Sequence, residues 1–238
     1  MPFYVVATPI GNLDDITYRA VNILKEADVI YCENEKNSSR LLNHYDIHTP
    51  LKRLFHSFSE KEFGIIAEKI RQGKNIALIS DAGTPGISDP GSSLIRYLRE
   101  NSIEVIPVPG ASALSAILSV SGWQSNPSVF LGFLPEKKGK KRTLLESLSD
   151  FEGLIIFYES VHKIRKTIET LSELFADSEL LIGRELTKKH EEILHFSQIS
   201  PEIAEKIVER GEFVVIINNF IKKISKENRK HPDMINKR

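Results

Sequence analysis

Short apolar runs alternate with amphipathic segments along the first half of the chain, starting at Phe3. Short, mainly apolar runs of this length are typical of buried strands, and they occur at residues 3–7, 29–31, 75–80 and 103–107. Between them, apolar residues recur every three or four positions, which predicts helices over residues 16–27, 59–70 and 92–100. Ser59 and Glu62 form a capping box at the start of the second helix. This alternation predicts a mainly parallel sheet covered on both faces.

The pattern lapses between Ser121 and Pro127, where small, polar and helix-breaking residues predict a linker, and then resumes. Further strands are predicted at residues 129–131, 154–158, 180–182 and 213–217, and a helix over 164–175. Ser200 and Pro201 are typical of the N-cap and first residue of another helix. We therefore predict two α/β domains, residues 1–120 and 127–221, followed by a basic tail, residues 222–238.

The composition is that of a globular protein, with 41% hydrophobic and 27% charged residues. A single cysteine, Cys32, excludes an intramolecular disulfide and favours a reducing compartment. The first strand follows Met1 without the basic segment of a signal peptide. No apolar run approaches the ~18 residues of a membrane span. We expect a soluble cytoplasmic protein with no membrane partner.

Charge is distributed unevenly although the formal net charge is zero. From Lys222 to Arg238 there are seven lysines and arginines against two acidic residues. A second basic cluster lies mid-chain and comprises Lys137, Lys138, Lys140, Lys141 and Arg142. Such runs are either solvated surface or a surface that contacts phosphate groups.

Three loops of the first domain follow predicted strands, at the edge of an open parallel sheet where ligands bind. In the first, Thr8 to Asn12, Pro9 stiffens the turn and Gly11 lets a ligand approach the backbone. The second, Ser80 to Gly91, holds three glycines and places Asp81 where it would pair with a ligand ammonium. Asp89, followed by Pro90, is instead typical of a helix cap. The third loop, Pro107 to Ala113, has small residues that suit either close packing or a cofactor.

Two charged segments end strands of the second domain. Phe157 to Ser160 closes one strand, and Gly183 to Glu192 closes another with a dense run of charges. That run is either a solvated turn or the wall of a site. No metal site is predicted, because the seven histidines are scattered and form no Cys/His cluster.

Six segments in this order resemble the tetrapyrrole-methylase superfamily, and within it the branch that methylates the RNA of the small ribosomal subunit. The segments are Thr8–Thr17, Ser80–Gly91, Val108–Leu114, Phe130–Pro135, Phe157–His162 and Arg184–Lys188. The resemblance implies a two-domain α/β fold, with a mainly parallel N-terminal sheet and a mixed C-terminal sheet. It also implies a homodimer that binds S-adenosylmethionine in the interdomain cleft and 2′-O-methylates a cytidine ribose of 16S ribosomal RNA in the small subunit.

Carried over by position, the resemblance assigns residues from both domains to the cofactor. They are Thr8, Pro9, Gly11, Asp81, Ala82, Gly83, Thr84, Ser112, Ala113, Tyr158, Leu186 and Thr187. The basic cluster at 137–142 is then expected to contact RNA.

Methyl transfer from a sulfonium is a displacement with an activated leaving group, so positioning supplies most of the rate. A ribose hydroxyl is a poor nucleophile, and a base should assist it. The candidates are Glu159, Glu185, Lys188 and His190, among which the sequence does not choose.

Two alternatives stay open from the sequence. The superfamily also supports carbon methylation of a porphyrin-like or corrin precursor. The segment Glu33-Asn34-Glu35-Lys36 stands where similar proteins carry Glu-Asp-Thr-Arg, and an arginine-to-lysine change alters a bidentate contact. That difference leaves open a second alternative, in which the protein binds RNA or the ribosome but has lost its catalytic activity.

Overall fold

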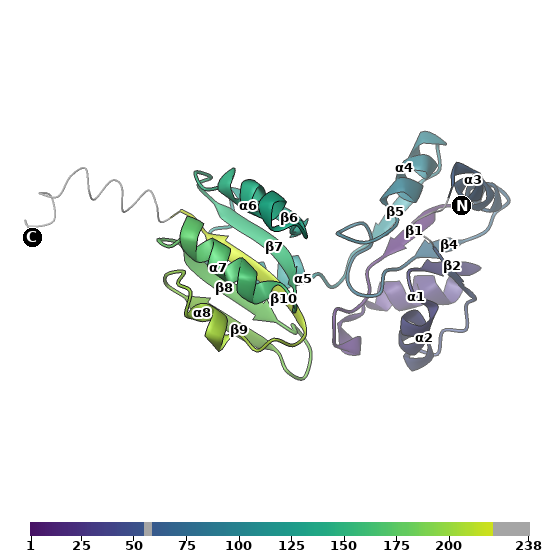
Figure 1. Ribbon diagram of the computed structural model, residues 1–238. Helices are drawn as coiled ribbons and strands as arrows, with labels where there is room; N and C mark the ends of the chain where they lie inside the picture. The colour runs from purple at the N-terminus through teal and green to yellow at the C-terminus, as the bar shows by residue number, and fades with distance from the viewer. Residues whose placement is uncertain (55–58, 221–238) are drawn as a thin grey trace, which may run out of the picture. The chain divides into compact units, whose positions relative to one another are not determined.

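The computed structural model describes residues 1–54 and 59–220, and the chain divides into two compact units, Met1–Ala113 and Leu114–Arg238. Figure 1 shows the elements of both units. The strands of the first unit are β1 (Phe3–Val6), β2 (Val29–Cys32), β3 (Leu51–Arg53), β4 (Ile76–Leu78) and β5 (Val105–Val108). Its helices are α1 (Tyr18–Glu26), α2 (Glu35–His44), α3 (Glu60–Arg71) and α4 (Ser92–Glu100), with a 3-10 turn at Leu13–Asp15.

The first sheet is parallel throughout, with strand order β3-β2-β4-β1-β5. One face packs against α3 and α4 through side chains such as Phe63, Ile66 and Leu98. The other face packs against α1 and α2, where Leu24 and Leu42 are buried. The predicted sheet covered on both faces is therefore confirmed, and so is the capping box of Ser59 and Glu62 at the start of α3.

The second unit contains β6 (Ser128–Phe133), β7 (Leu154–Ser160), β8 (Glu179–Arg184), β9 (Glu192–Phe196) and β10 (Glu212–Asn218). Its helices are α5 (Ala113–Ser119), α6 (Lys138–Glu146), α7 (Ile164–Leu174) and α8 (Ile203–Lys206). The sheet has the order β6-β7-β10-β8-β9, with β6 parallel to β7 and the other pairs antiparallel, which confirms a mixed sheet. The boundary between the units lies between Ala113 and Leu114, directly after the first residue of α5.

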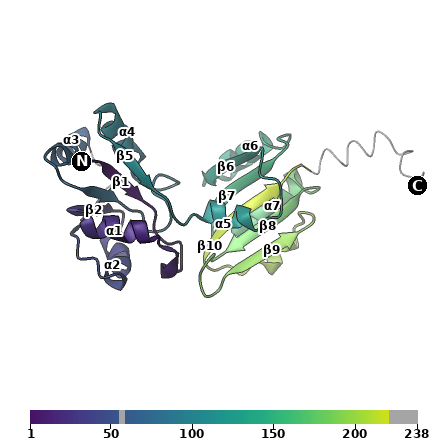
Figure 2. The same cartoon turned by 180° about the vertical axis from the view of Figure 1, so that it is seen from behind.

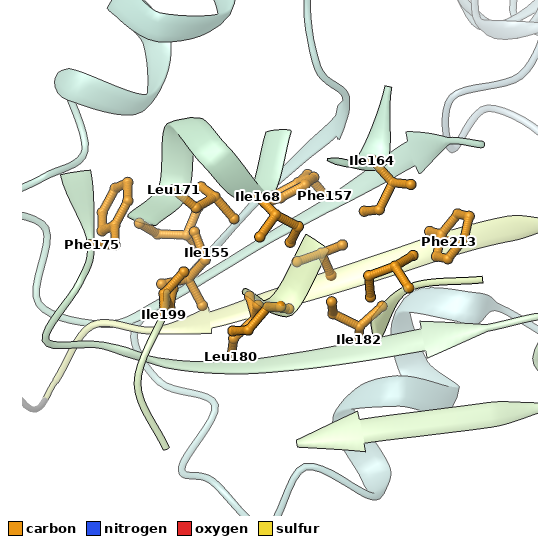
Figure 3. Packing of buried hydrophobic residues seen from close by; sticks show 14 of the residues in the cluster. Ile155, Phe157, Ile164, Ile168, Leu171, Phe175, Leu180, Ile182, Ile199 and Phe213 are labelled. Carbon is orange, nitrogen blue, oxygen red and sulfur yellow. The ribbon is translucent and has the colours of Figure 1, made fainter. Parts of the chain in front are cut away.

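The core of the second unit lies between one face of its sheet and the helices α6, α7 and α8 (Figure 1). Figure 3 shows Ile168 and Leu171 of α7 packed over Ile155 and Phe157 of β7, with Phe213 of β10 beside them. The opposite face carries α5, as the view from behind shows (Figure 2). An added Cβ on Gly183 of β8 would lie 2.8 Å from Ile117 of α5, so a glycine lets this helix approach the sheet closely.

The sequence pattern misses α2, β3, α6 and β9, assigns the wrong cap to α4, and starts α8 too early, although the predicted bounds of α4 are confirmed. Asp89 does not cap α4, because the N-cap is Gly91, at φ 126°, and no side chain bonds to that end. The helix predicted from Ser200 begins only at Ile203, after a turn in which Ile203 N–H donates to the Ser200 carbonyl. In residues 1–54 and 59–220, every helix is too short or too polar to cross a bilayer. The tail predicted at 222–238 lies outside the described residues.

Candidate functional site

Three loops of the first unit meet at the carboxyl ends of the neighbouring strands β4, β1 and β5. Thr8, after β1, forms an isolated antiparallel bridge with Gly83, after β4. Thr8 N–H donates to the Gly83 carbonyl at 2.8 Å, and Gly83 N–H donates to the Thr8 carbonyl at 3.0 Å. The Thr84 hydroxyl donates to the Ala111 carbonyl in the third loop at 3.4 Å. The loops predicted as cofactor contacts are thus joined into one unit, which we call the three-loop cradle (residues 8–11, 80–84 and 110–113).

Thr8 and Ser80 brace the cradle from inside. The Thr8 side chain is 2% exposed, and its hydroxyl donates to the Ser80 carbonyl at 3.1 Å. The Ser80 hydroxyl in turn donates to the Gly83 carbonyl at 3.2 Å. Thr8 therefore joins the first two loops of the cradle through its buried hydroxyl.

Glycines bring the cradle's backbone segments together. Gly83 has φ 83°, a left-handed conformation that disfavours other residues, and an added Cβ would lie 3.4 Å from Ile10. An added Cβ on Gly110 would lie 2.9 Å from the Cβ of Ala7. Gly11, Ala82 and Gly110 are exposed, while Ser112 and Ala113 are partly exposed. The cradle therefore presents small side chains and backbone to solvent, and this surface suits a ligand that lies against main-chain groups, such as a nucleoside.

Asp81 lies at the rim of the cradle and is bonded to the start of α2. Its Oδ1 accepts from the Asn34 N–H at 3.1 Å, and its Oδ2 accepts from Asn37 Nδ2 at 2.7 Å. Asn34 is the N-cap of α2, and its Oδ1 accepts from the Lys36 N–H at 3.0 Å. Asparagine and aspartate cap helices about equally well, so the altered segment at residues 33–36 still fixes α2 against Asp81.

Asp89, which the sequence pattern assigns to the helix cap, is hydrogen-bonded to Ser80 of the cradle and has an altered pKa. Burial is the main cause that raises the pKa of Asp89 to about 6, and the negative charge of Glu33 adds to it. A hydrogen bond with Ser80 acts in the opposite direction, and Asp81 raises the pKa further. Three carboxylates therefore gather beyond β2 and β4. The sequence signal for this cluster is only that Glu33 and Asp81 each follow a strand of the same parallel sheet.

In the second unit, Glu159 is buried in an ion pair. Its Oε2 accepts from Lys141 Nζ at 2.7 Å and from the Thr167 hydroxyl at 2.7 Å, and its Oε1 accepts from the Ser160 N–H at 2.8 Å. The Lys141 side chain is only 8% exposed. The prediction that Lys141 contacts RNA is therefore corrected, because its ammonium is held inside the unit by Glu159 and Thr167.

The rest of the basic cluster lies at the surface. Lys137, Lys138 and Lys140 are exposed, at and just before the first turn of α6. Arg142 is partly exposed and pairs with Glu146 and Glu173, which raises the pKa of its guanidinium. Of the basic cluster, Lys137, Lys138 and Lys140 are therefore the lysines that face solvent.

The charged loop after β8 contains a compact network. Lys188 Nζ lies 2.8 Å from Glu185 Oε1 and 2.9 Å from Glu212 Oε2. Burial opposes the charge of each group, but the hydrogen bond and ion pair between them lower the pKa of Glu185 and raise the pKa of Lys188. Glu185 and Thr187 have positive φ angles of 49° and 66°, so the backbone of this loop is strained at two positions.

The other predicted residues of this unit differ in exposure. Leu186 is buried at 7% exposure, whereas Thr187 and Tyr158 are partly exposed and His190 is exposed. Tyr158 lies against two phenylalanine rings, Phe130 and Phe133, with ring centroids 5.0 Å and 5.5 Å away.

The sequence is similar to that of known proteins along most of its length. Residues 2–199 match the family model of tetrapyrrole (corrin/porphyrin) methylases. The chain is 51% identical over 231 residues to a ribosomal RNA small subunit methyltransferase I of Leptospira biflexa, covering 97% of this chain and 96% of that protein. It is 40% identical to the protein of that name from Bacillus subtilis, covering 90% of this chain and 74% of the relative.

Solved structures share the fold at low sequence identity. A cobalt precorrin-4 methyltransferase has a TM-score of 0.66 at 14% identity, covering 92% of this chain and 95% of the other. A uroporphyrin-III C-methyltransferase of Thermus thermophilus, in complex with S-adenosylhomocysteine, has a TM-score of 0.61 at 18% identity, covering 94% of this chain and 100% of the other.

Proposed function

The chain belongs to the tetrapyrrole (corrin/porphyrin) methylase family and is a methyltransferase, and we propose that it methylates the RNA of the small ribosomal subunit with S-adenosylmethionine. The observation that supports ribosomal RNA as the methyl acceptor is the 51% identity to an RNA methyltransferase of this subunit, over nearly the full length of both chains. The solved structures of enzymes named for precorrin and uroporphyrin are matched at only 14–18% identity, so they support the fold alone.

The three-loop cradle is the proposed cofactor site. Exposed backbone at Gly11, Ala82 and Gly110 would lie against the nucleoside, and the rim carboxylate of Asp81 would attract the cationic end of the molecule. Ser112 and Ala113 would add small side chains, and Pro9 and Thr84 would hold the loops in shape. Tyr158, Leu186 and Thr187 of the second unit complete the proposed set. When bound, S-adenosylmethionine supplies a methyl group on an activated sulfonium.

The acceptor is proposed to be the 2′-hydroxyl of a cytidine ribose in 16S ribosomal RNA. Among the four candidates for a base, Glu159 is fully engaged with Lys141 and Thr167, and Lys188 is kept protonated by two carboxylates. Glu185 and His190 remain. Glu185 is held ionised, and both hydrogen bonds to its carboxylate in the described part of the chain go to Oε1. We assign the proton-accepting role to Oε2 of Glu185, with His190 as the second candidate.

The substrate surface is proposed to include Lys137, Lys138 and Lys140, which are exposed and form no ion pair with the residues that the structure describes. Backbone phosphates bind such lysines through charge without reading sequence. Arg142 is already paired with Glu146 and Glu173, so it contributes less. We also propose that the protein works in the cytoplasm, where ribosomal RNA is found, and that it forms the homodimer that the family resemblance implies.

The test is a methyl-transfer assay with labelled S-adenosylmethionine and three acceptors side by side: unmodified small subunits, naked 16S ribosomal RNA and uroporphyrinogen. We expect label on the subunits or the RNA, and digestion to nucleosides should recover it as 2′-O-methylcytidine. Label on uroporphyrinogen alone would contradict the proposal. Cofactor binding without label on any acceptor would identify a lapsed enzyme.

The matched variants in the same assay are Glu185→Gln and Glu191→Gln. Loss of the Glu185 carboxylate should lower kcat about 100-fold at saturating RNA and cofactor, in the range of general-base contributions. The exposed Glu191 lies in the same loop, and its glutamine variant keeps a side-chain oxygen that can accept from the Thr187 N–H, so it serves as the control. Equal activity of both variants would shift the proton-accepting role to His190.

A further inference from the structure

An irregular end of β6 brings two phenylalanines to one side of the second sheet. Phe130 pairs with Ile156 and Phe133 pairs with Tyr158, so three residues of β6 span the same length as two residues of β7. Phe130 and Phe133 are three positions apart and would point to opposite faces of a regular strand. The extra residue of this bulge, with Gly132 at φ 63°, puts both rings against the ring of Tyr158.

The result is an aromatic cluster whose outermost ring is open to solvent. Phe133 is 60% exposed, whereas Phe130 and Tyr158 are partly exposed beneath it. The T-shaped contacts with Tyr158 fix the orientation of both rings, so Phe133 does not fold back onto the protein. Exposing a phenylalanine to this extent costs hydrophobic stabilisation that burial would have supplied. A bulge that turns an aromatic ring outward is therefore a feature that folding alone does not explain.

The chain that leaves Phe133 leads directly to the exposed lysines. Lys137 is four residues further on, so its Cα lies within about 14 Å of that of Phe133. Lys163 Nζ, 2.9 Å from Glu136 Oε1, joins this segment to the turn after β7. An exposed aromatic face followed by Lys137, Lys138 and Lys140 is the combination that binds single-stranded nucleic acid, in which bases stack on rings and phosphates meet cations.

We propose that Phe133 is a stacking platform for an unpaired RNA base and so positions the substrate strand on the second unit. The inference rests on the proposed function, because it names how that same RNA is held. Phe133 is a positioning residue: it touches the RNA at a base, and the proposed chemistry takes place elsewhere. The adenine of the cofactor is a different occupant for the same ring, and a second copy of the chain is another; both are outcomes of the test below.

The experiment compares Phe133→Leu, which keeps an apolar side chain without an aromatic face, with Phe133→Trp, which keeps the face. In the full chain, the Leu variant should raise KM for small subunits or 16S ribosomal RNA about tenfold, as expected for loss of one stacked base. Its kcat and its calorimetric Kd for S-adenosylmethionine should match the wild type. The Trp variant should restore KM, and its added fluorescence should be quenched by RNA, with the single native Trp123 as background.

Two controls separate stacking from other effects. Val208→Ala removes another apolar side chain that is 49% exposed in the same unit, and its KM should not change. Lys138→Glu should weaken RNA binding and reduce the slope of log K against log salt. Phe133→Leu should weaken binding with the slope unchanged, because stacking releases no counterions.

Wild-type KM in the Leu variant, together with unquenched fluorescence in the Phe133→Trp variant, would overturn the inference while leaving the proposed function intact. A parallel loss of cofactor affinity would assign the ring to adenine, and a change of oligomeric state in light scattering would assign it to a second copy; either overturns the proposal. Failure of the wild type to methylate any RNA would instead refute the proposed function.

Discussion

The two units hold their functional loops by different forces. In the first unit, the three-loop cradle is held by main-chain hydrogen bonds between Thr8 and Gly83 and by neutral hydroxyls. In the second unit, ion pairs hold the candidate site residues in place, through the buried pair of Lys141 and Glu159 and the network around Lys188. A backbone-built site leaves small exposed groups for a ligand. A site built from ion pairs occupies the very side chains that look reactive in the sequence.

This difference explains why a charged residue in the sequence of the second unit does not by itself indicate a residue that contacts substrate. Lys141 belongs to a basic cluster and Glu159 ends a strand, yet each mainly neutralises the other. Leaving either one alone in the interior is costly, because a buried charge without its partner has lost its hydration. Substitutions in the second unit should therefore affect stability most, and substitutions in the cradle should affect cofactor binding most.

The largest expected effect comes from breaking the buried pair. Lys141→Met should lower the free energy of unfolding by about 3–5 kcal/mol, because it leaves the Glu159 carboxylate buried without a cation. Arg142→Met, on the next residue of α6, removes surface ion pairs and should cost at most about 1 kcal/mol. Urea unfolding of the two variants measures both effects. The double variant Lys141→Met with Glu159→Leu should regain much of the loss, and a Lys141→Met variant no less stable than Arg142→Met would contradict the account.

A smaller effect is expected from the left-handed glycine of the cradle. Gly83→Ala should lower the free energy of unfolding by about 1–2 kcal/mol, because φ 83° is unfavourable for a residue with a Cβ. The strained φ would act inside the cradle itself, where the new methyl group would also contact Ile10 of the first loop, and this should weaken S-adenosylmethionine binding about tenfold.

Gly86→Ala is the matched control, with φ 86° and open space around the added Cβ. It should lose similar stability but keep the cofactor Kd, as measured by calorimetry. Equal loss of affinity in both variants would show that the effect is general strain in the loop and not the shape of the cradle.

The last prediction concerns the pH dependence of stability and Asp89. The folded pKa of about 6 lies above the ordinary value of 3.8, so the folded state binds this proton more tightly than the unfolded state. The resulting stabilisation is complete below about pH 4 and is lost as the pH rises to about 6. Asp89→Asn should therefore gain stability relative to the wild type over that interval, and the gain should level off above it. Thermal unfolding between pH 4 and pH 8 measures the difference, and a difference that does not change with pH would refute the raised pKa.

The cradle was predictable from sequence because a parallel sheet fixes where loops gather. The strands β1, β4 and β5 each stand out in the sequence as a short, mainly apolar run, and ligands bind beyond the carboxyl ends of parallel strands. Helix α6 was missed because Lys137 to Arg142 resembles a solvated charge run, and Leu145 is the one fully buried apolar residue that the helix supplies. The pairing of Lys141 with Glu159 and Thr167 could not be predicted from the sequence. These partners are 18 and 26 residues away along the chain, and sequence spacing does not reveal such contacts.

The bulge in β6 shows a related limit. Phe130 and Phe133 have the spacing of residues on opposite faces, and only the positive φ of Gly132 and the register shift reveal that both contact Tyr158. The Asn34 cap also had to be seen in the structure, since the sequence difference at residues 33–36 indicates altered chemistry and the contacts instead indicate a preserved helix start.

The most direct test of the central claim is amide hydrogen exchange of the wild-type chain with and without saturating S-adenosylmethionine. If the cofactor lies against the backbone-built cradle, peptides that cover residues 8–11, 80–84 and 110–113 should all be protected together, while residues 137–142 of the basic cluster should not change. Unchanged exchange in all three cradle peptides, under conditions in which calorimetry shows the cofactor bound, would contradict it.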